Sequence, residues 1–152
     1  CDKVAIIDWD VHHGNGTEDL VRRRKTDDIH YLSTHEWPLF PGTGGPDAPD
    51  HPMITNRVLS SCSGSESFRA VFEKEILPVI EHHAPDILVI SAGFDAHRDD
   101  PLATLTWDEE DYAWATQMLK VLGKPMIFVL EGGYDLFALE NSVTAVIDTL
   151  IT

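Results

Sequence analysis

Val4-Ala5-Ile6-Ile7, an apolar run, leads directly into the polar series Asp8-Trp9-Asp10-Val11-His12 near the start of the sequence. A short run of this kind, rich in β-branched residues, is typical of a strand buried on both faces of a parallel sheet. Asp8, Asp10 and His12 follow at a spacing of two, which in extended backbone directs their side chains to the same side. We therefore expect a strand whose carboxyl end carries a carboxylate and imidazole cluster able to hold a divalent cation.

Similar apolar runs recur along the chain and alternate with segments that have helical periodicity. The expected strands are Val4–Ile7, Ile29–Leu32, Ile87–Ile90 and Met126–Leu130. The expected helices are Thr17–Lys25, Ser65–Glu81 with a candidate kink at Pro78, a helix from a Thr106–Glu109 capping box to about Leu122, and Leu136–Leu150. Glu36–Pro52, rich in Gly and Pro, is expected to be a long loop. This alternation predicts an α/β fold with a parallel sheet between helices.

The composition favours an acidic protein that binds neither nucleic acid nor membranes. The 152 residues carry a formal charge of −15 and an isoelectric point near 4.6, which disfavours polyanionic partners and favours cationic ones. No apolar run approaches the roughly 20 residues that a membrane span requires. Cys1 and Cys62 form no recognisable disulfide or zinc pattern, so a reducing compartment is expected, the cytoplasm or, in a eukaryote, the nucleus. Any metal is therefore expected to have oxygen and nitrogen ligands.

Two further expected strands also end in polar residues beside glycine. Ile87–Ile90 runs into Ser91-Ala92-Gly93-Phe94-Asp95, and Met126–Leu130 runs into Glu131-Gly132-Gly133-Tyr134. The carboxyl ends of parallel strands meet at one edge of a sheet, and glycine there allows a metal or substrate to approach the backbone. Taken singly, each strand end also suits a helix cap, a turn or a polar strand exit. Together the three strand ends predict one site.

Four segments, in this order, resemble the signature segments of histone deacetylases. They are Asp8-Trp9-Asp10-Val11-His12-His13-Gly14-Asn15-Gly16-Thr17, Phe40-Pro41-Gly42-Thr43-Gly44, Ser91-Ala92-Gly93-Phe94-Asp95 and Glu131-Gly132-Gly133-Tyr134. Asn15 after His-His-Gly, and Phe94 before Asp95, are similar to the class II and bacterial branch of the family. The resemblance implies the family's arginase-like α/β fold. It also implies zinc-dependent hydrolysis of the acetamide of acetyl-lysine or of a small acyl-amide.

The resemblance further implies roles for individual residues. Asp10, His12 and Asp95 match the three zinc ligands, a set that ferrous iron also accepts. Such a set leaves coordination positions open for the acetyl carbonyl oxygen and a water molecule. Tyr134 matches the phenol that donates a hydrogen bond to the developing oxyanion.

Supporting positions match as well. Asp8 and Asn15 match the residues that support two catalytic histidines. A structural monovalent cation, usually potassium, is implied at Asp8, Asp10, His12, Ser33 and Thr34. The substrate channel is implied to be lined by Phe40, Leu102, Gly132 and Gly133. The expected substrate is an acetylated lysine in a peptide or protein, or another acetylated amine.

The sequence departs from the family in one respect, because the family's general base is one of two adjacent histidines upstream of the zinc ligands. His12-His13 is not that pair, since His12 matches a zinc ligand and His13 is expected to point to the opposite side. His82-His83 is expected to be a solvated cap at the end of a helix. We therefore expect residues 1–152 to be the C-terminal, zinc-binding half of a deacetylase domain, which lacks the first strands of the sheet and needs the N-terminal half for activity.

Three other functions fit parts of the sequence. Asp95-Ala96-His97-Arg98-Asp99 spells a motif of arginases and related ureohydrolases, which hold two manganese ions, although Tyr134 has no role in those enzymes. An acetylpolyamine amidohydrolase suits the acidic composition, whereas Leu102 stands where polyamine-selective class II relatives have glutamate and so favours acetyl-lysine. A non-catalytic module that binds zinc or acyl-lysine is the third alternative, and the absent histidine pair supports it.

Overall fold

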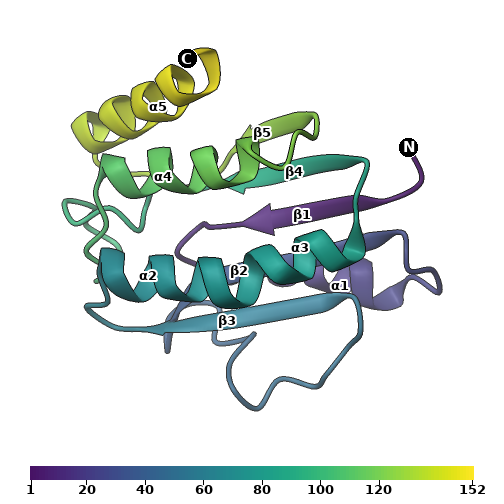
Figure 1. Cartoon of the computed structure of the whole chain (residues 1–152). Helices are drawn as coiled ribbons and strands as arrows, with labels where there is room; N and C mark the ends of the chain where they lie inside the picture. Colours follow the sequence, from purple (N-terminus) through teal and green to yellow (C-terminus); the bar gives the residue numbers. More distant parts are fainter.

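A sheet of five parallel strands organises the chain, for which a computed structural model describes residues 1–152 (Figure 1). The strand order is β3-β2-β1-β4-β5, so the first strand in sequence is the central one. The strands are β1 Val4–Asp8, β2 Ile29–Trp37, β3 Ile54–Ser60, β4 Ile87–Ala92 and β5 Met126–Leu130. The predicted parallel α/β class is confirmed.

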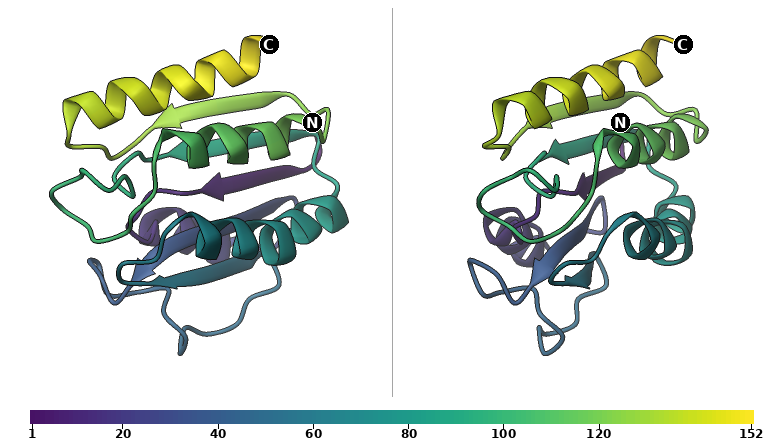
Figure 2. Two further views of the ribbon diagram at one scale, coloured as in Figure 1. Left: turned by 60° about the vertical axis from the view of Figure 1, so that its left-hand side comes forward. Right: turned by 90° about the vertical axis from the view of Figure 1, so that its left-hand side faces the viewer.

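Helices lie on both faces of the sheet (Figure 2). They are α1 Asn15–Arg23, α2 Ser65–Val71, the π-helical turn η1 Phe72–Ile76, α3 Leu77–His83, α4 Glu109–Lys120 and α5 Leu136–Ile151. In Figure 2, α1 lies on one side of the sheet, whereas α2, α3 and α4 lie on the other. Helix α5 packs against α4, near the β5 edge of the sheet. No helix in the chain is both long enough and apolar enough to cross a membrane.

The strand register aligns the carboxyl ends of the central strands. Asp8, the last residue of β1, pairs with Ser33 of β2 on one side and with Ser91 of β4 on the other. Ala92, the last residue of β4, pairs with Leu130 of β5. The loops that leave β1, β4 and β5 therefore begin at the same edge of the sheet, as the polar strand ends predicted.

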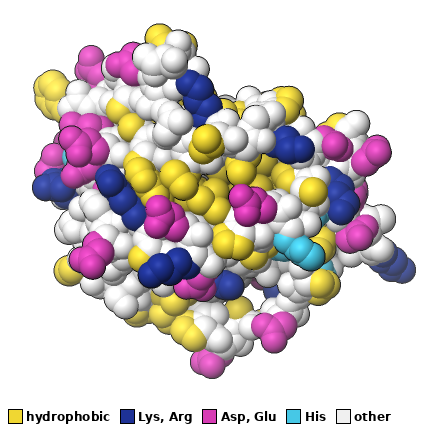
Figure 3. Space-filling view, in the orientation of Figure 1, with side chains coloured by type: hydrophobic (Ala, Val, Ile, Leu, Met, Phe, Trp, Pro, Cys, Tyr) yellow, Lys and Arg dark blue, Asp and Glu magenta, His cyan; other side chains and the backbone are white.

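The hydrophobic core lies between the sheet and the helices α2, η1, α3 and α4. Aromatic rings dominate it: Phe68 of α2 stacks on Trp107 at a centroid distance of 3.8 Å, and Tyr112 of α4 lies 6.3 Å from Trp9. On β4, Leu88 and Ile90 alternate with half-buried neighbours and are both 0% exposed. Figure 3 views this helical face, where hydrophobic side chains remain visible between α4 and the α2–α3 pair.

The opposite face of the sheet is only partly covered. Helix α1 contacts β2 and β3 but leaves the β1–β4–β5 side open (Figure 2). On β5, Ile127 is 50% exposed and Val129 is 45% exposed. The outer edge of β5 also has no strand neighbour. We call Ile127, Val129 and this edge the open face of β5.

Several expected boundaries were wrong for identifiable reasons. Strand β2 extends to Trp37, past its expected end at Leu32 and into the expected loop, because its last residues pair with β3. Strand β3 itself was missed, since Asn56 and Arg57 interrupt its apolar pattern at a sheet edge.

The helices also differ from expectation in detail. A bend was expected at Pro78, and the structure has the π-helical turn η1 there, which ends two residues before this proline. Proline has no backbone N–H to donate, so it interrupts the regular helical hydrogen bonds. Helix α4 is capped by Asp108 with Asp111, not by the expected Thr106 and Glu109. His83 is buried, with Nε2 lying 3.1 Å from the Val4 carbonyl oxygen, so the expected solvated cap was wrong for this residue.

Candidate metal and catalytic site

Asp10, His12 and Asp95 form the one cluster of metal-ligating side chains in the structure, with ligand atoms within 4.8 Å of one another. His12 Nδ1 lies 3.1 Å from Asp10 Oδ1 and 3.1 Å from Asp95 Oδ2. The first two residues follow β1 and the third follows β4. The sequence prediction that these side chains converge is therefore confirmed in the geometry.

Backbone donors fix the two carboxylates. Strand β1 ends at Asp8, so Asp10 and His12 lie in a bend rather than in the extended backbone that was expected. The bend is held because the His12 N–H donates to Asp10 Oδ1 at 2.8 Å. Asp95 Oδ1 accepts from the Val11 N–H at 2.9 Å, and Asp10 Oδ2 accepts from the Gly132 N–H at 3.0 Å. Each carboxylate thus keeps an oxygen directed at His12 Nδ1.

Two glycines leave room for the cluster. A Cβ atom on Gly93 would overlap Asp10 Oδ2, and a Cβ atom on Gly132 would overlap Asp95 Oδ2. Any side chain at either position would therefore displace a carboxylate. This close approach explains why glycine stands two residues before Asp95 and two residues before Tyr134 in the sequence.

The charges of the cluster favour the binding of a cation between its side chains. Hydrogen bonding to Asp10, then to Asp95, raises the pKa of the His12 imidazole to about 10. Burial raises the pKa of Asp95, while hydrogen bonds from His12 and Gly132 outweigh burial and lower that of Asp10. Two carboxylates and an imidazole that together attract a proton this strongly form a donor set that fits a divalent cation.

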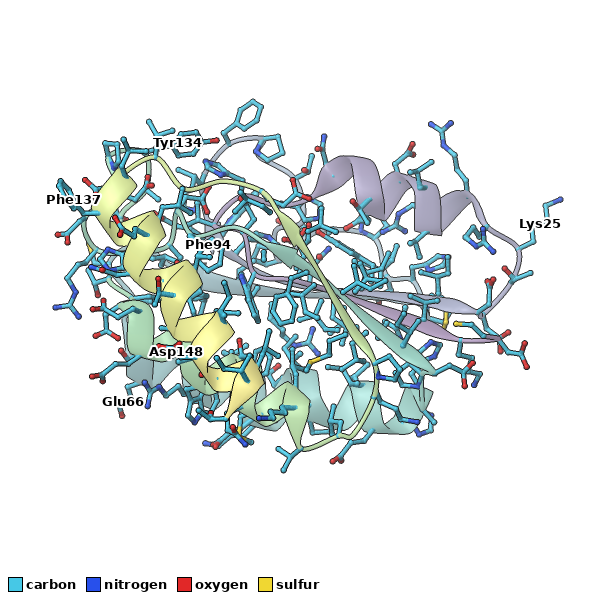
Figure 4. All side chains as sticks on the ribbon, turned by 90° about the horizontal axis from the view of Figure 1, so that it is seen from above. Lys25, Glu66, Phe94, Tyr134, Phe137 and Asp148 are labelled. Atoms are coloured by element: carbon cyan, nitrogen blue, oxygen red, sulfur yellow. The ribbon has the colours of Figure 1, made fainter.

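Aromatic residues border the cluster on its exposed side. Phe40 is exposed, and its ring lies 6.4 Å from the His12 ring at an interplanar angle of 71°. Tyr134 is 55% exposed and lies with Phe137 at the end of the molecule where β5 gives way to α5, opposite Lys25 (Figure 4). Burial, then the charges of Asp95 and Asp10, raises the pKa of the Tyr134 phenol.

A small polar pocket of about 200 Å³ adjoins the cluster. It is lined by Asp8, Asp10, His12, His13, Gly14, Thr17, Ser91 and Glu131. Asp8 is buried and accepts from the Tyr31 hydroxyl at 2.8 Å, and burial raises its pKa to about 7. Ser91 donates to Glu131 at 3.0 Å. Tyr31, Ser91 and Glu131 were not predicted as site residues. Ser91 is the next-to-last residue of β4 and Glu131 directly follows β5, where site residues were expected.

The remaining predicted residues are distributed around this region. Ser33 and Thr34 are buried in β2, where the Ser33 hydroxyl lies 2.9 Å from His35 Nδ1. Asn15 is exposed at the start of α1 and does not line the polar pocket. Leu102 is exposed on the loop that follows Asp95. His13 turns away from the cluster and contacts Thr43 and Glu18, each at 2.8 Å.

The arginase-like motif does not assemble a second metal site. His97 Nε2 lies 3.3 Å from Glu109 Oε2, and Asp99 is mostly exposed beside it. Neither residue belongs to the cluster that contains Asp95. The geometry therefore offers ligands for one cation, which disfavours the two-manganese alternative.

Comparison with known proteins agrees with this geometry. The family described as "Histone deacetylase domain" matches residues 1–150. Histone deacetylase 15 of Arabidopsis thaliana is 39% identical over 158 residues, which cover 98% of this chain and 28% of that protein. A probable deacetylase of Methanothermobacter thermautotrophicus is 40% identical over 92% of this chain and 44% of its own length.

Solved structures give the same result. The crystal structure of the HDA15 HD domain matches with a TM-score of 0.92 and 38% identity, over 99% of this chain and 44% of that chain. An acetylpolyamine aminohydrolase from Burkholderia pseudomallei matches with a TM-score of 0.89 and 28% identity, over 97% of this chain and 44% of its own. The chain thus spans about half the length or less of these relatives. The resemblance carried by the four sequence segments is confirmed, and the chain belongs to the histone deacetylase family.

Proposed function

We propose that this chain is the metal-binding part of a zinc-dependent deacetylase that hydrolyses the acetamide of acetyl-lysine. The observation that carries the proposal is the convergence of Asp10, His12 and Asp95, with Tyr134 at the next strand end. The family membership supports deacetylase chemistry in general.

The proposed zinc ligands are Asp10, His12 and Asp95, through His12 Nδ1 and one oxygen of each carboxylate. Their negative charge and their mixture of oxygen and nitrogen donors suit zinc, and ferrous iron is the alternative cation. A bound zinc ion would polarise the acetyl carbonyl and lower the pKa of a water molecule. The Gly93 and Gly132 positions keep the carboxylates in place because no Cβ atom intrudes on them.

Tyr134 is proposed to donate its phenolic hydrogen to the oxyanion that develops on the acetyl oxygen. A phenol with its ordinary pKa of 10.0 is already protonated at neutral pH, as a donor must be, and the pKa of Tyr134 is raised further in the same direction. Phe40, with Leu102 and the backbone of Gly132 and Gly133, is proposed to line the channel for the lysine methylenes. The edge-on position of Phe40 beside His12 supports this assignment.

Asp8 and Asn15 are proposed to support catalytic histidines supplied from outside this chain. The polar pocket beside Asp8 offers space for an imidazole, whereas the exposed position of Asn15 gives weaker support. A potassium ion is proposed at Asp8, Asp10, His12, Ser33 and Thr34. The direct register between Asp8 and Ser33 supports that site.

The proposed N-terminal half of the domain would pack on the open face of β5. Ile127 and Val129 present apolar side chains there, and β5 has a free edge for a further parallel strand. Activity is therefore proposed for the protein that contains both halves. The cytoplasm stays a prediction, since a relative 40% identical over 93% of this chain, Histone deacetylase 14 of Arabidopsis thaliana, is named chloroplastic.

An acetylpolyamine is the alternative substrate, favoured by the formal charge of −15 and by the similarity to the Burkholderia pseudomallei aminohydrolase. Leu102 offers no charge to a polyamine and supports acetyl-lysine. Comparing kcat/KM for an acetyl-lysine peptide with that for acetylspermidine distinguishes the two substrates. A higher kcat/KM for acetylspermidine would identify an acetylpolyamine as the substrate and would leave the proposed zinc-dependent mechanism unchanged.

Replacing the phenol of Tyr134 tests the proposed chemistry. In the full-length protein, Tyr134→Phe is expected to lower kcat about 100- to 1000-fold, the usual effect of losing one oxyanion donor. Zinc content should remain near one per chain, because Tyr134 is not a proposed ligand. Unchanged turnover would remove Tyr134 from the mechanism, and zinc binding without any turnover in the parent protein would favour the non-catalytic alternative.

A further inference from the structure

Asp100 joins two segments that flank the proposed site. Its side chain is buried, at 6% exposure of the residue, in the loop that follows Asp95. Oδ2 accepts from the Tyr134 N–H at 2.8 Å, and Oδ1 accepts from the Leu102 N–H at 2.9 Å. One carboxylate therefore holds the start of the Tyr134 segment and the start of the Leu102 segment together.

The turn that carries Tyr134 is held by hydrogen bonds on both sides of this residue. Its first half is tied to β4 and to the loop after it, because the Glu131 N–H donates to the Ala92 carbonyl at 3.1 Å and the Phe94 N–H donates to the Gly132 carbonyl at 2.8 Å. Gly133 then adopts a φ of 139°, a conformation open mainly to glycine. The Tyr134 phenol makes no hydrogen bond in the structure, and its side chain is largely exposed. After Tyr134, Asp135 caps α5, because its Oδ1 accepts from the Phe137 N–H at 3.0 Å and from the Ala138 N–H at 2.8 Å. The bond to Asp100 is thus the only hydrogen bond that Tyr134 itself makes.

We propose that Asp100 is a positioning residue that fixes the Tyr134 turn and the Leu102 loop as one unit. The inference rests on the proposed role of Tyr134 in acetamide hydrolysis. Hydrogen bonds from backbone N–H groups to a carboxylate are stronger than those to a neutral acceptor, so a buried Asp can hold both segments in register. Asp100 would act on the oxyanion only through the placement of the phenol, which must be set in advance to stabilise the transition state.

The chain provides a matched control in Glu36. This buried carboxylate holds the same loop, because it accepts from the Thr104 N–H at 2.9 Å and from the Thr104 hydroxyl at 2.6 Å. It also accepts from the Ser61 hydroxyl at 2.8 Å. Glu36 has no contact with the Tyr134 turn. Glu36→Gln therefore perturbs a buried anchor of the loop without releasing the phenol.

The test is a double-mutant cycle in the full-length, zinc-loaded protein, with Asp100→Asn, Tyr134→Phe and the double variant. An Asn side chain keeps one carbonyl oxygen, so it can accept only one of the two N–H groups well. We expect Asp100→Asn to lower kcat about 10- to 100-fold with a smaller change in KM, the scale of a misplaced catalytic group. In the Tyr134→Phe background the same change should alter kcat by less than about twofold, since coupled residues are non-additive.

A structural readout accompanies the kinetics. Hydrogen exchange of the Tyr134 amide should accelerate in Asp100→Asn and stay at the parent rate in Glu36→Gln. Equal fold losses of kcat from Asp100→Asn in both backgrounds, or unchanged exchange, would overturn the positioning role. If Asp100→Asn folds poorly, Asp100→Ser, which keeps one acceptor, carries the same cycle. If Tyr134→Phe alone leaves turnover unchanged, the proposed function fails first.

Discussion

The two faces of the central sheet differ in how completely this chain covers them. On the helical face, Leu88 and Ile90 are wholly buried beneath α2–α4, together with an aromatic cluster. On the open face of β5, Ile127 and Val129 keep about half of their surface exposed. The difference teaches that burial within this chain anchors β5 from the helical face only, whereas α1 also covers β2 and β3 on the opposite face. The metal cluster lies at the carboxyl edge, where both faces meet.

The largest expected effect is on the free energy of unfolding, for which we compare one substitution on each face. Trp107→Ala on the helical face should lower the free energy of unfolding by about 3 to 5 kcal/mol, because it empties a fully buried, stacked position. Val129→Ala on the open face should cost less than about 1 kcal/mol in this chain, because that side chain is half exposed. Urea unfolding of the two variants measures both values. Similar losses would contradict the difference between the faces.

The second expected effect is a loss of stability at low pH, caused by a buried histidine on the helical face. His30 is buried against His83, with ring centroids 5.4 Å apart, and His30 Nε2 lies 2.9 Å from the Thr55 hydroxyl. Burial, then the nearby His83, His51 and His82, lowers the pKa of His30 to about 4 from its ordinary 6.5.

The sign of the pH effect follows from this lowered pKa. As pH falls below 6.5, His30 binds a proton in the unfolded chain but stays neutral in the folded chain. The free energy of unfolding therefore falls between pH 6.5 and pH 4. At about 1.4 kcal/mol per pKa unit, the loss is on the order of 3 kcal/mol. Urea midpoints for the parent and for His30→Gln, at pH 7.5 and pH 5, measure the part lost by pH 5, which is about 2 kcal/mol. An identical acid loss in both proteins would remove His30 as its source.

The third expected effect is on zinc affinity at the carboxyl edge of the sheet. Gly132→Ala places a Cβ atom against the carboxylates of Asp95 and Asp10, so zinc affinity should fall about 10- to 100-fold, the range for disturbed support of metal ligands. Gly16→Ala is the matched control, since nothing lies within 4 Å of its Cβ position. Competition with a chromogenic chelator measures both affinities. An unchanged affinity in Gly132→Ala would show that the cluster is not the metal site.

The residues differ in how far sequence could predict them. Asp10, His12, Asp95 and Tyr134 follow apolar strands, and a parallel sheet collects strand ends at one edge, so their meeting was predictable from local pattern. Phe40 was named through the resemblance as a channel residue; its ring lies 6.4 Å from the His12 ring, and its role in a channel stays a prediction.

Other residues owe their roles to contacts that no local pattern contains. Asp100 bonds to a backbone group 34 positions away, and Glu36 bonds to Thr104, 68 positions away. His83 followed a solvated helix-end pattern, but packing against His30 buries it. Strand β3 was missed because an edge strand needs apolar residues on fewer of its positions.

The most direct test of the central claim is metal content together with hydrolysis of an acetyl-lysine peptide. Both are measured on the full-length protein and on its Asp95→Asn variant. We expect one zinc per chain and turnover in the parent, with both lost in the variant, since Asp95 supplies one of the three proposed ligands. Two manganese ions per chain, or turnover that survives without bound metal, would contradict the account.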